Sequence, residues 1–219
     1  MTDIESQTAP ALMRYVLERF GTRVAIASSF GPEDIVLIDF AARTGLPFRV
    51  FTLDTDFLFP ETYALIDAVE RRWEIEVERC RPALTPDEQA AIHGPALWTR
   101  DPDRCCAVRK VEPLKAKLAT LRAWITGIRR DQAPTRANAQ KLEWDEKFRL
   151  WKANPLADWT AERVWEHIRA QELPYNPLHD RGYPSIGCTY CTRAVREGED
   201  PRAGRWAGFA KTECGLHRT

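Results

Sequence analysis

The sequence lacks the features that place a protein in a membrane or on nucleic acid. No apolar stretch approaches the roughly 20 residues that span a bilayer, and the acidic start Met1-Thr2-Asp3-Ile4-Glu5 has no apolar core of a secretory signal. Lysine and arginine together number 32, as do aspartate and glutamate, so the 219 residues carry no excess charge that attracts a polyanion. We therefore expect a cytoplasmic protein with no membrane or nucleic-acid partner, whose anion sites are local clusters of cations.

Two common nucleotide-binding motifs are also missing. The chain contains neither GxxxxGK[ST] nor GxGxxG, which excludes a Walker P-loop and a dinucleotide fingerprint. It has no internal repeat and no low-complexity linker. We expect one domain over residues 1–219, with a C-terminal layer and tail from about residue 173 where loops replace the regular pattern. A homo-oligomer is compatible with the sequence.

Short apolar runs alternate with helical patterns over residues 11–126. The runs carry apolar side chains at successive positions, which is typical of strands buried on both faces of a parallel sheet. This order predicts an α/β fold, a parallel twisted sheet with helices on both faces. The expected strands cover residues 24–27, 48–53, 75–77 and 123–126. The expected helices cover residues 11–20, 33–43, 59–73 and, further along, 160–170.

The turn Ser28-Ser29-Phe30-Gly31 leads from a predicted strand into a predicted helix. Backbone N–H groups at such a helix start can cradle an anion, and plain capping of the helix is the alternative. Glu33 and Asp34 follow at once, and they would repel an anion unless they point away.

The turn Gly127-Ile128-Arg129-Arg130 follows the last predicted strand. Guanidinium groups bind phosphate or sulfate through paired hydrogen bonds, and a solvated loop is the alternative. Ligands of parallel sheets lie beyond the carboxyl ends of the strands, so we favour an anion site here.

Four cysteines form two close pairs, Cys105-Cys106 and Cys188-Thr189-Tyr190-Cys191. An adjacent pair fits the ligand spacing of zinc poorly, whereas a 4Fe–4S cube accepts neighbouring cysteines because each binds a different iron. If a helix begins at Cys105, Arg109 and Lys110 lie on the faces that carry the sulfurs. The pattern therefore favours an anionic thiolate-bound cluster.

A further cysteine, Cys214, stands five residues before the end of the chain among Lys211, His217 and Arg218. We expect a tail residue to be accessible, and neighbouring cations favour the nucleophilic thiolate. An ordinary exposed cysteine is the alternative.

Together these segments resemble the thioredoxin-dependent sulfonucleotide reductases, which reduce adenylyl sulfate (APS) or phosphoadenylyl sulfate (PAPS). The resemblance runs from Ser28 to His217 and rests on SSFGPED, LDTDFLFPET, CCAVRK, TGIRRDQ, NPLHDRGYPSIGCTYC and KTECGLH. It implies an adenine-nucleotide α-hydrolase-like fold with a modified PP-loop at the Ser28–Gly31 turn. In LDTD, this chain has Asp56 where the family often has glycine.

The resemblance also implies roles for individual residues. Cys214 would attack the sulfur of APS, giving S-sulfocysteine and AMP, and thioredoxin, a separate protein, would then release sulfite. The implied residues around the reaction are Cys214, Lys110, His217, Arg205 and Arg202. The implied nucleotide-binding residues are Ser28, Ser29, Phe30, Gly31, Asp54, Thr55, Gly127, Arg129 and Arg130. The implied ligands of a 4Fe–4S cluster are Cys105, Cys106, Cys188 and Cys191.

Three alternatives remain at the level of sequence. Members with both cysteine pairs usually reduce APS, but a PAPS or dual-specificity reductase carries the same chemistry. A PP-loop enzyme that thiolates tRNA can hold a cluster too, although no basic excess or RNA-binding appendage is present. A non-catalytic metal-binding sensor would leave Cys214 and the arginine turn without a shared purpose.

Overall fold

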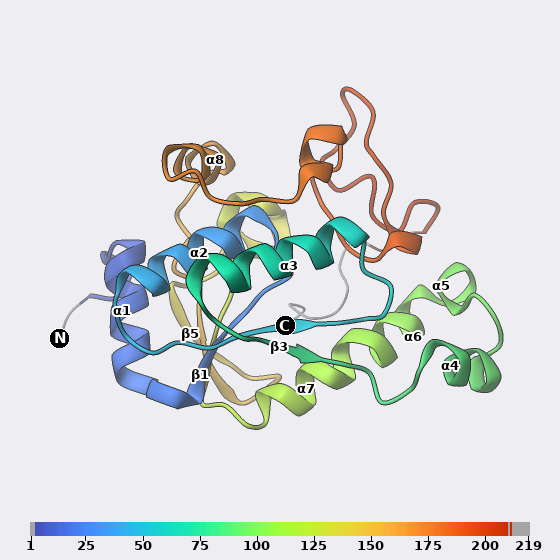
Figure 1. The fold of residues 1–219 in the computed structure, drawn as a ribbon, viewed down its shortest axis with the longest axis horizontal. Helices are drawn as coiled ribbons and strands as arrows, with labels where there is room; N and C mark the ends of the chain where they lie inside the picture. Colours follow the sequence, from blue (N-terminus) through green and yellow to red (C-terminus); the bar gives the residue numbers. More distant parts are fainter. Residues whose placement is uncertain (1–2, 210, 212–219) are drawn as a thin grey trace. The chain divides into compact units, whose positions relative to one another are not determined.

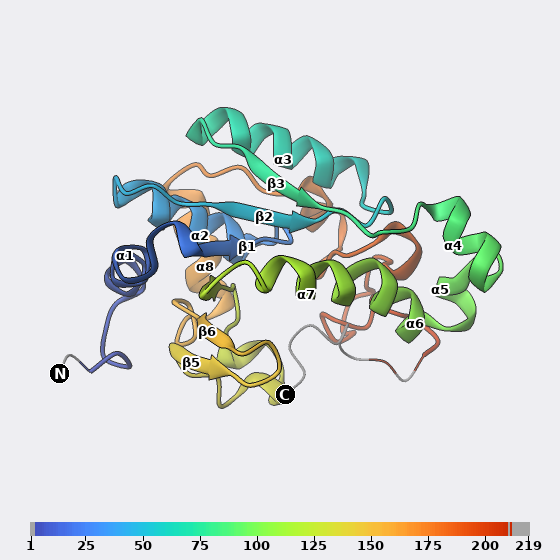
Figure 2. The same cartoon turned by 90° about the horizontal axis from the view of Figure 1, so that it is seen from below.

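The computed structural model describes residues 3–209 and Lys211, so Cys214 and His217 lie outside the described residues. The chain divides into two compact units. Figures 1 and 2 show its helices and strands from two sides. The first unit consists of Met1–Thr52, Leu65–Glu78 and Leu118–Tyr175, and the second of Leu53–Ala64, Arg79–Lys117 and Asn176–Thr219. That the chain acts as a single domain with a C-terminal layer stays a prediction.

A six-stranded, mostly parallel sheet has the strand order β3-β2-β1-β4-β6-β5. Its strands are β1 (Val24–Ala27), β2 (Val50–Leu53), β3 (Val77–Cys80), β4 (Ala123–Ile125), β5 (Leu142–Asp145) and β6 (Leu150–Ala153). Ile26 of β1 lies in register with Val50 on one side and Ile125 on the other, both parallel. Successive residues of β1 and β4 are buried, as they must be when both faces of a sheet are covered. The predicted α/β fold is confirmed.

The edge hairpin of β5 and β6 was missed by the sequence analysis, which placed no strand after residue 126. The two strands pair antiparallel, with Leu142 opposite Ala153, while β6 also pairs parallel to β4. The chain turns between them through Arg149 at a φ of 57°, so the turn lacks the glycine that usually marks a hairpin. The predicted strand at 75–77 also begins later, at Val77.

Eight α-helices accompany the sheet in the described part of the chain. They are α1 (Ala9–Phe20), α2 (Pro32–Arg43), α3 (Pro60–Trp73), α4 (Pro86–His93), α5 (Leu97–Arg100), α6 (Pro102–Cys106), α7 (Glu112–Leu118) and α8 (Ala161–Ala170). In the first unit α2 packs against α1 and α8 (Figure 1). A buried polar contact joins two of them, since His167 Nε2 lies 2.9 Å from Asp39 Oδ2. No described helix is long and apolar enough to cross a bilayer.

The helix that carries the first cysteine pair is interrupted. Helix α6 is capped by Asp101, whose Oδ1 accepts the N–H of Arg104 at 2.8 Å. It continues through a π-helical turn, Ala107–Val111, into α7. The N–H of Glu112 reaches back to the carbonyl of Ala107, one residue further than in an α-helix. Such single π-turns occur frequently at functional sites, and this one holds two of the predicted cations.

Candidate functional site

The first part of the site lies at the point where the strand order of the first unit reverses. Strands β1 and β4 are neighbours although β2 and β3 come between them in sequence, and the crevice outside such a switch point is where open α/β sheets bind ligands. The turn Ser28–Gly31 follows β1 and Gly127–Arg130 follows β4, and we call them the first and second turns. Gln132, which follows the second turn, links that turn to the start of α2, because its Nε2 donates both to the Gly127 carbonyl at 3.3 Å and to Glu33 Oε1 at 3.1 Å.

A carboxylate of the chain itself fills the cradle of the first turn. Asp34 Oδ2 accepts the N–H of Ser29 at 2.7 Å, the hydroxyl of Ser29 at 3.0 Å and the N–H of Gly31 at 3.4 Å. Phe30, at a φ of 62°, is buried, and its N–H donates to the hydroxyl of Ser28. Asp34 therefore points into the turn. Its side chain accepts hydrogen bonds from the backbone N–H groups that the sequence analysis proposed as donors to a bound anion.

The environment of Asp34 disfavours its charge. Burial raises the pKa of Asp34 from 3.8 to about 7, with a further rise from the neighbouring Glu33, and the hydrogen bonds from Ser29 and Gly31 only partly offset this. Gly127 is required nearby, since a Cβ at that position would lie 2.6 Å from Asp34 Oδ1 and 2.8 Å from Glu33 Cβ. The two turns are thus packed in direct contact around this carboxyl group.

The two arginines of the second turn already have carboxylate partners. Arg129 is almost fully buried, donates to Glu33 Oε1 at 2.9 Å and pairs with Asp131. Arg130 donates to Glu5 Oε2 at 2.7 Å and to the carbonyl of Ala139 at 2.8 Å. An anionic ligand at this turn would have to share or displace these partners.

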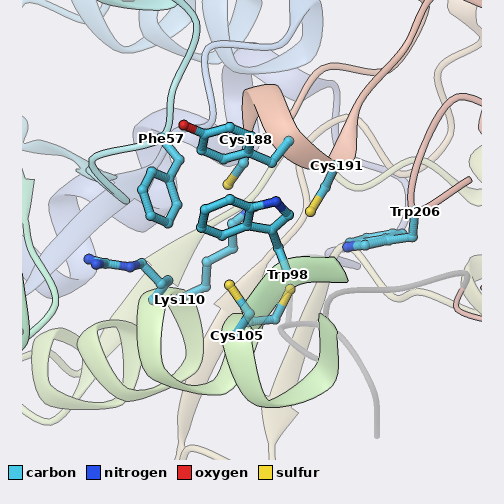
Figure 3. A pocket seen from close by; sticks show the side chains of 10 residues that line it. Phe57, Trp98, Cys105, Lys110, Cys188, Cys191 and Trp206 are labelled. Carbon is cyan, nitrogen blue, oxygen red and sulfur yellow. The ribbon is translucent and has the colours of Figure 1, made fainter. Parts of the chain in front are cut away.

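The second part of the site is a pocket in the second unit, which we call the cysteine pocket. It is lined by Phe57, Trp98, Cys105, Cys106, Arg109, Lys110, Cys188, Tyr190, Cys191 and Trp206. Figure 3 shows the sulfurs of Cys105, Cys188 and Cys191 pointing toward a common space from α6 and from the short turn Thr189–Cys191. The two cysteine pairs predicted to act together therefore meet, although about 80 residues separate them in the sequence.

The cysteine-bearing turn is fixed to the segment that follows β2. The backbone of Thr189 donates to the carbonyl of Phe57 at 2.8 Å, and Leu58 forms an isolated antiparallel bridge with Cys188. The hydroxyl of Thr55 lies 3.3 Å from Cys188 Sγ. Thr55, predicted at the nucleotide, is thus a buried neighbour of the cysteine pocket.

Two thiols of the pocket, those of Cys105 and Cys191, resist ionisation. Burial and, to a smaller extent, the other three thiols of the pocket raise the pKa of Cys105 to about 12. Burial also raises the pKa of Cys191 to about 11, ahead of the effect of two neighbouring thiols. Several thiolates can coexist in such a place only with a cation among them, and metal binding supplies one while releasing the protons.

The spacing of the thiols does not suit a single metal ion. Within residues 3–209 and Lys211, no three His, Cys, Asp or Glu side chains are close enough to hold one. Tetrahedral zinc at Zn–S distances of about 2.3 Å would draw its sulfurs to about 3.8 Å from one another. A polynuclear cluster binds its cysteines at separate corners, which accommodates wider spacing and an adjacent pair.

Cations surround the pocket as the sequence analysis expected for Lys110 and Arg109. Both line it, and Lys110 and Arg205 each favour the ionised form of Cys191. Arg205 donates to the hydroxyl of Ser185 and lies 4.5 Å from the ring of Trp206. The backbone of Arg202 accepts the N–H of Arg205 at 2.9 Å.

Lys211, the last described residue, is buried and tied to the start of α6. Its Nζ donates to the carbonyl of Pro102 at 3.2 Å and pairs with Asp103. The expected nucleophile Cys214 stands three residues later in the sequence and, like His217, lies outside the described residues.

The sequence analysis assigned no role to the aromatic side chains that line the pocket. Trp98 and Tyr190 stack with ring centroids 4.0 Å apart, and Phe57 meets both edge-on at 5.2 Å. Of these aromatic residues, only Tyr190 could have been placed at the pocket from the sequence, because it lies between Cys188 and Cys191. Asp54 was expected at the nucleotide, but here its Oδ1 accepts the hydroxyl of Tyr63 at 2.7 Å.

A comparison with known proteins identifies the family of this chain. Residues 23–194 match the phosphoadenosine phosphosulfate reductase domain. The chain belongs to the phosphoadenosine phosphosulfate reductase family.

Two curated relatives are equally similar but differ in name. Adenosine 5′-phosphosulfate reductase of Halalkalibacterium halodurans is 47% identical over 216 residues, covering 98% of this chain and 94% of the relative. Phosphoadenosine 5′-phosphosulfate reductase of Gloeobacter violaceus is also 47% identical over 216 residues, covering 97% and 90%. Both span nearly the whole chain, so the family relation is not limited to one part.

A solved structure agrees with the fold. Phosphoadenylyl-sulfate reductase of Candida auris, crystallised as a phosphate complex, is 28% identical with a TM-score of 0.75, covering 87% of this chain and 91% of the other. These matches favour the sulfonucleotide reductases over the tRNA-thiolating and sensor alternatives.

The buried carboxyl group of Asp34 makes stability depend on pH. Between about pH 4 and 7 the folded chain holds a proton that the unfolded chain has released, so rising pH destabilises the fold through this group. Asp34→Asn cannot titrate, so its stability relative to the parent should rise between pH 5 and 8 by on the order of 2 kcal/mol. Urea unfolding at both pH values measures this. Asp87→Asn, at an exposed carboxylate, should show no such trend, and a constant difference for Asp34→Asn would contradict the assignment.

Proposed function

We propose that this chain reduces adenosine 5′-phosphosulfate to sulfite and AMP, with thioredoxin as the electron donor and Cys214 as the nucleophile. The observation that carries the proposal is a pocket of four thiols and flanking cations in a chain of this reductase family. The names of the relatives support sulfonucleotide reduction, and the proposal extends it to this substrate and route. The reaction belongs to sulfate assimilation in the cytoplasm.

The proposed chemistry has two stages. The Cys214 thiolate attacks the sulfur of APS, forming an S–S bond while the S–O bond to the phosphate breaks and AMP leaves. A thioredoxin thiolate then attacks Cys214 Sγ, which releases sulfite and leaves a mixed disulfide. The second thioredoxin thiol resolves this disulfide, so thioredoxin is oxidised and Cys214 is restored. Two electrons thus pass from thioredoxin to the sulfur that departs as sulfite.

Cations must neutralise the sulfonate oxygens while the bonds to sulfur change. Lys110 and Arg205 are proposed for this task because both lie near the cysteine pocket, and Arg202 is proposed with them from the family resemblance. Phosphate, ribose and base are assigned to the switch point, where the first and second turns meet. With Asp34 in the first turn, the nucleotide would either meet the rim of that turn or displace the carboxyl group.

A 4Fe–4S cluster is proposed in the cysteine pocket, held by Cys105, Cys106, Cys188 and Cys191. The residues fit, since Cys105, Cys106 and Cys188 are buried and line one pocket with the partly buried Cys191, and an adjacent pair suits a polynuclear centre better than one ion. When bound, the cluster would supply fixed charge near the sulfonate site, whereas electrons come from thioredoxin.

The second turn and the cysteine pattern support the proposed preference for APS over PAPS. PAPS has an additional 3′-phosphate, and a site for it needs cations that are free to bind a dianion. Arg129 and Arg130 are already paired with Glu33, Asp131 and Glu5, which disfavours the extra phosphate. The alternative is a PAPS reductase, which the name of the Gloeobacter relative favours.

The cluster predicts iron in the purified protein. Protein prepared anaerobically should be brown and contain about four irons per chain. Cys106→Ser should lose most of this iron because one corner lacks its ligand, while Cys80→Ser, outside the pocket, should keep it. Metal analysis and visible absorption measure both variants. Stoichiometric zinc without iron in the parent protein would overturn the assignment.

The nucleophile assignment predicts a covalent intermediate. Incubation with APS and no reductant should add one sulfonate group to the peptide that contains Cys214, as seen by mass spectrometry. Cys214→Ser should abolish sulfite release, since its hydroxyl is a far weaker nucleophile, yet keep iron and nucleotide binding. Cys80→Ser serves as the matched control with normal turnover. Undiminished activity of Cys214→Ser would exclude this role.

The substrate assignment predicts a kinetic preference. With one thioredoxin and identical conditions, sulfite release should give kcat/KM at least about tenfold higher for APS than for PAPS, equivalent to about 1.4 kcal/mol of transition-state binding. A tenfold preference for PAPS would replace the substrate while leaving the reaction type in place. No sulfite from either nucleotide would overturn the proposed function itself.

A further inference from the structure

The loop after β2 contains a strained acidic residue beside the cysteine pocket. Asp56 has a φ of 58°, in the left-handed region that glycine adopts freely and most L-residues avoid. Its N–H is held by Asp54 Oδ1 at 3.2 Å. Keeping a carboxylate where glycine relieves strain calls for an interaction that only the side chain provides.

That interaction is an ion pair with Arg109. Asp56 Oδ2 lies 3.0 Å from Arg109 Nη1, and the carboxylate is partly exposed while the guanidinium is 1% exposed. Gln89 Oε1 accepts from Arg109 Nε at 2.9 Å, the Leu84 carbonyl accepts from Nη1 at 3.1 Å, and the Phe57 ring lies 4.7 Å away. A buried guanidinium is tolerated only when it is paired in this way.

One end of this anchored guanidinium is unused. Arg109 Nη2 is buried and has no hydrogen-bond partner among the described residues. Arg109 lines the cysteine pocket together with the four cysteines, so its positive charge lies at the wall that carries the sulfurs. A buried N–H donor without a partner is costly, and a ligand rich in sulfur and negative charge would satisfy it.

We propose that Asp56 is a positioning residue, which holds the Arg109 guanidinium at the cysteine pocket so that Nη2 serves the group bound there. This inference rests on the proposed cluster for the identity of that group. It explains why an aspartate occupies the left-handed backbone position at residue 56. Asp56 keeps Arg109 in place by ion pairing from the side where the loop is partly open to solvent.

The test compares three variants by the rate at which anaerobic protein loses iron to a chelator. Asp56→Gly removes the carboxylate and relieves strain, and it should lose iron about 10-fold faster than the parent. Asp56→Asn keeps an acceptor oxygen and tolerates the left-handed conformation, so its rate should lie between the two. Glu74→Gly is the matched control, an exposed acidic residue at a φ of 51° that does not line the pocket, and it should match the parent. A parent-like rate for Asp56→Gly would overturn the proposal.

A second measurement separates this proposal from the cluster assignment. In iron-free protein, the unfolding free energies of Asp56→Gly, Arg109→Gln and the double variant should be non-additive, because the two side chains form one interaction. Additive values would overturn the positioning role whatever the iron content. Coupling without iron in the parent would keep Asp56 as the residue that positions Arg109 and reject only the cluster.

Discussion

The second unit depends on placing four thiols in one confined pocket, where negative charges would repel one another. Burial and neighbouring thiols raise the pKa values of Cys105 and Cys191. Positive side chains from two segments offset the negative charge that ionised thiols would carry. Arg109 and Lys110 follow the first cysteine pair on the same helix, and Arg205 comes from a later segment of the chain. Arg109 in turn needs Asp56 and Gln89 to be tolerated in the interior. The cations therefore stabilise negative charge at the cysteines, and Asp56 and Gln89 in turn stabilise the buried charge of Arg109.

In the first unit, carboxyl groups of the chain satisfy the N–H donors and the cations of the two turns. The helix start after β1 presents N–H donors, and Asp34 supplies the acceptor. Arg129 and Arg130 lie beyond β4, and Glu33, Asp131 and Glu5 neutralise them. A nucleotide that binds here exchanges existing partners instead of filling unpaired sites. Such exchange favours a ligand with modest charge, since each displaced carboxylate must find water or another donor.

The sequence predicted what depends on local pattern and failed where distant residues decide. The buried strands 24–27 and 123–126 and the helix beginning near Pro32 were found because apolar runs and a proline are local signals. The hairpin of β5 and β6 was missed because its turn uses Arg149 in place of glycine. Thr55, which the family resemblance placed at the nucleotide, also lies against Cys188, a contact that no sequence pattern indicated. No local pattern reveals that the loop after β2 and the second cysteine pair are adjacent.

Around the first cysteine pair, the helix differs from the regular one that the sequence analysis assumed. The spacing argument placed Arg109 and Lys110 near the sulfurs by assuming a regular α-helix from Cys105. The chain instead inserts a π-turn over Ala107–Val111, which adds a residue between the cysteines and α7. One extra residue rotates the following side chains by about 100° on a helix of 3.6 residues per turn. Two successive cations can thus both line the pocket while α7 resumes with its own apolar face inward. Residues such as Leu114 and Leu118 stay buried in consequence. The hydrogen bonds of a π-turn have poorer geometry than those of an α-helix. Here the π-turn lies where the helix places two positive side chains at a buried pocket.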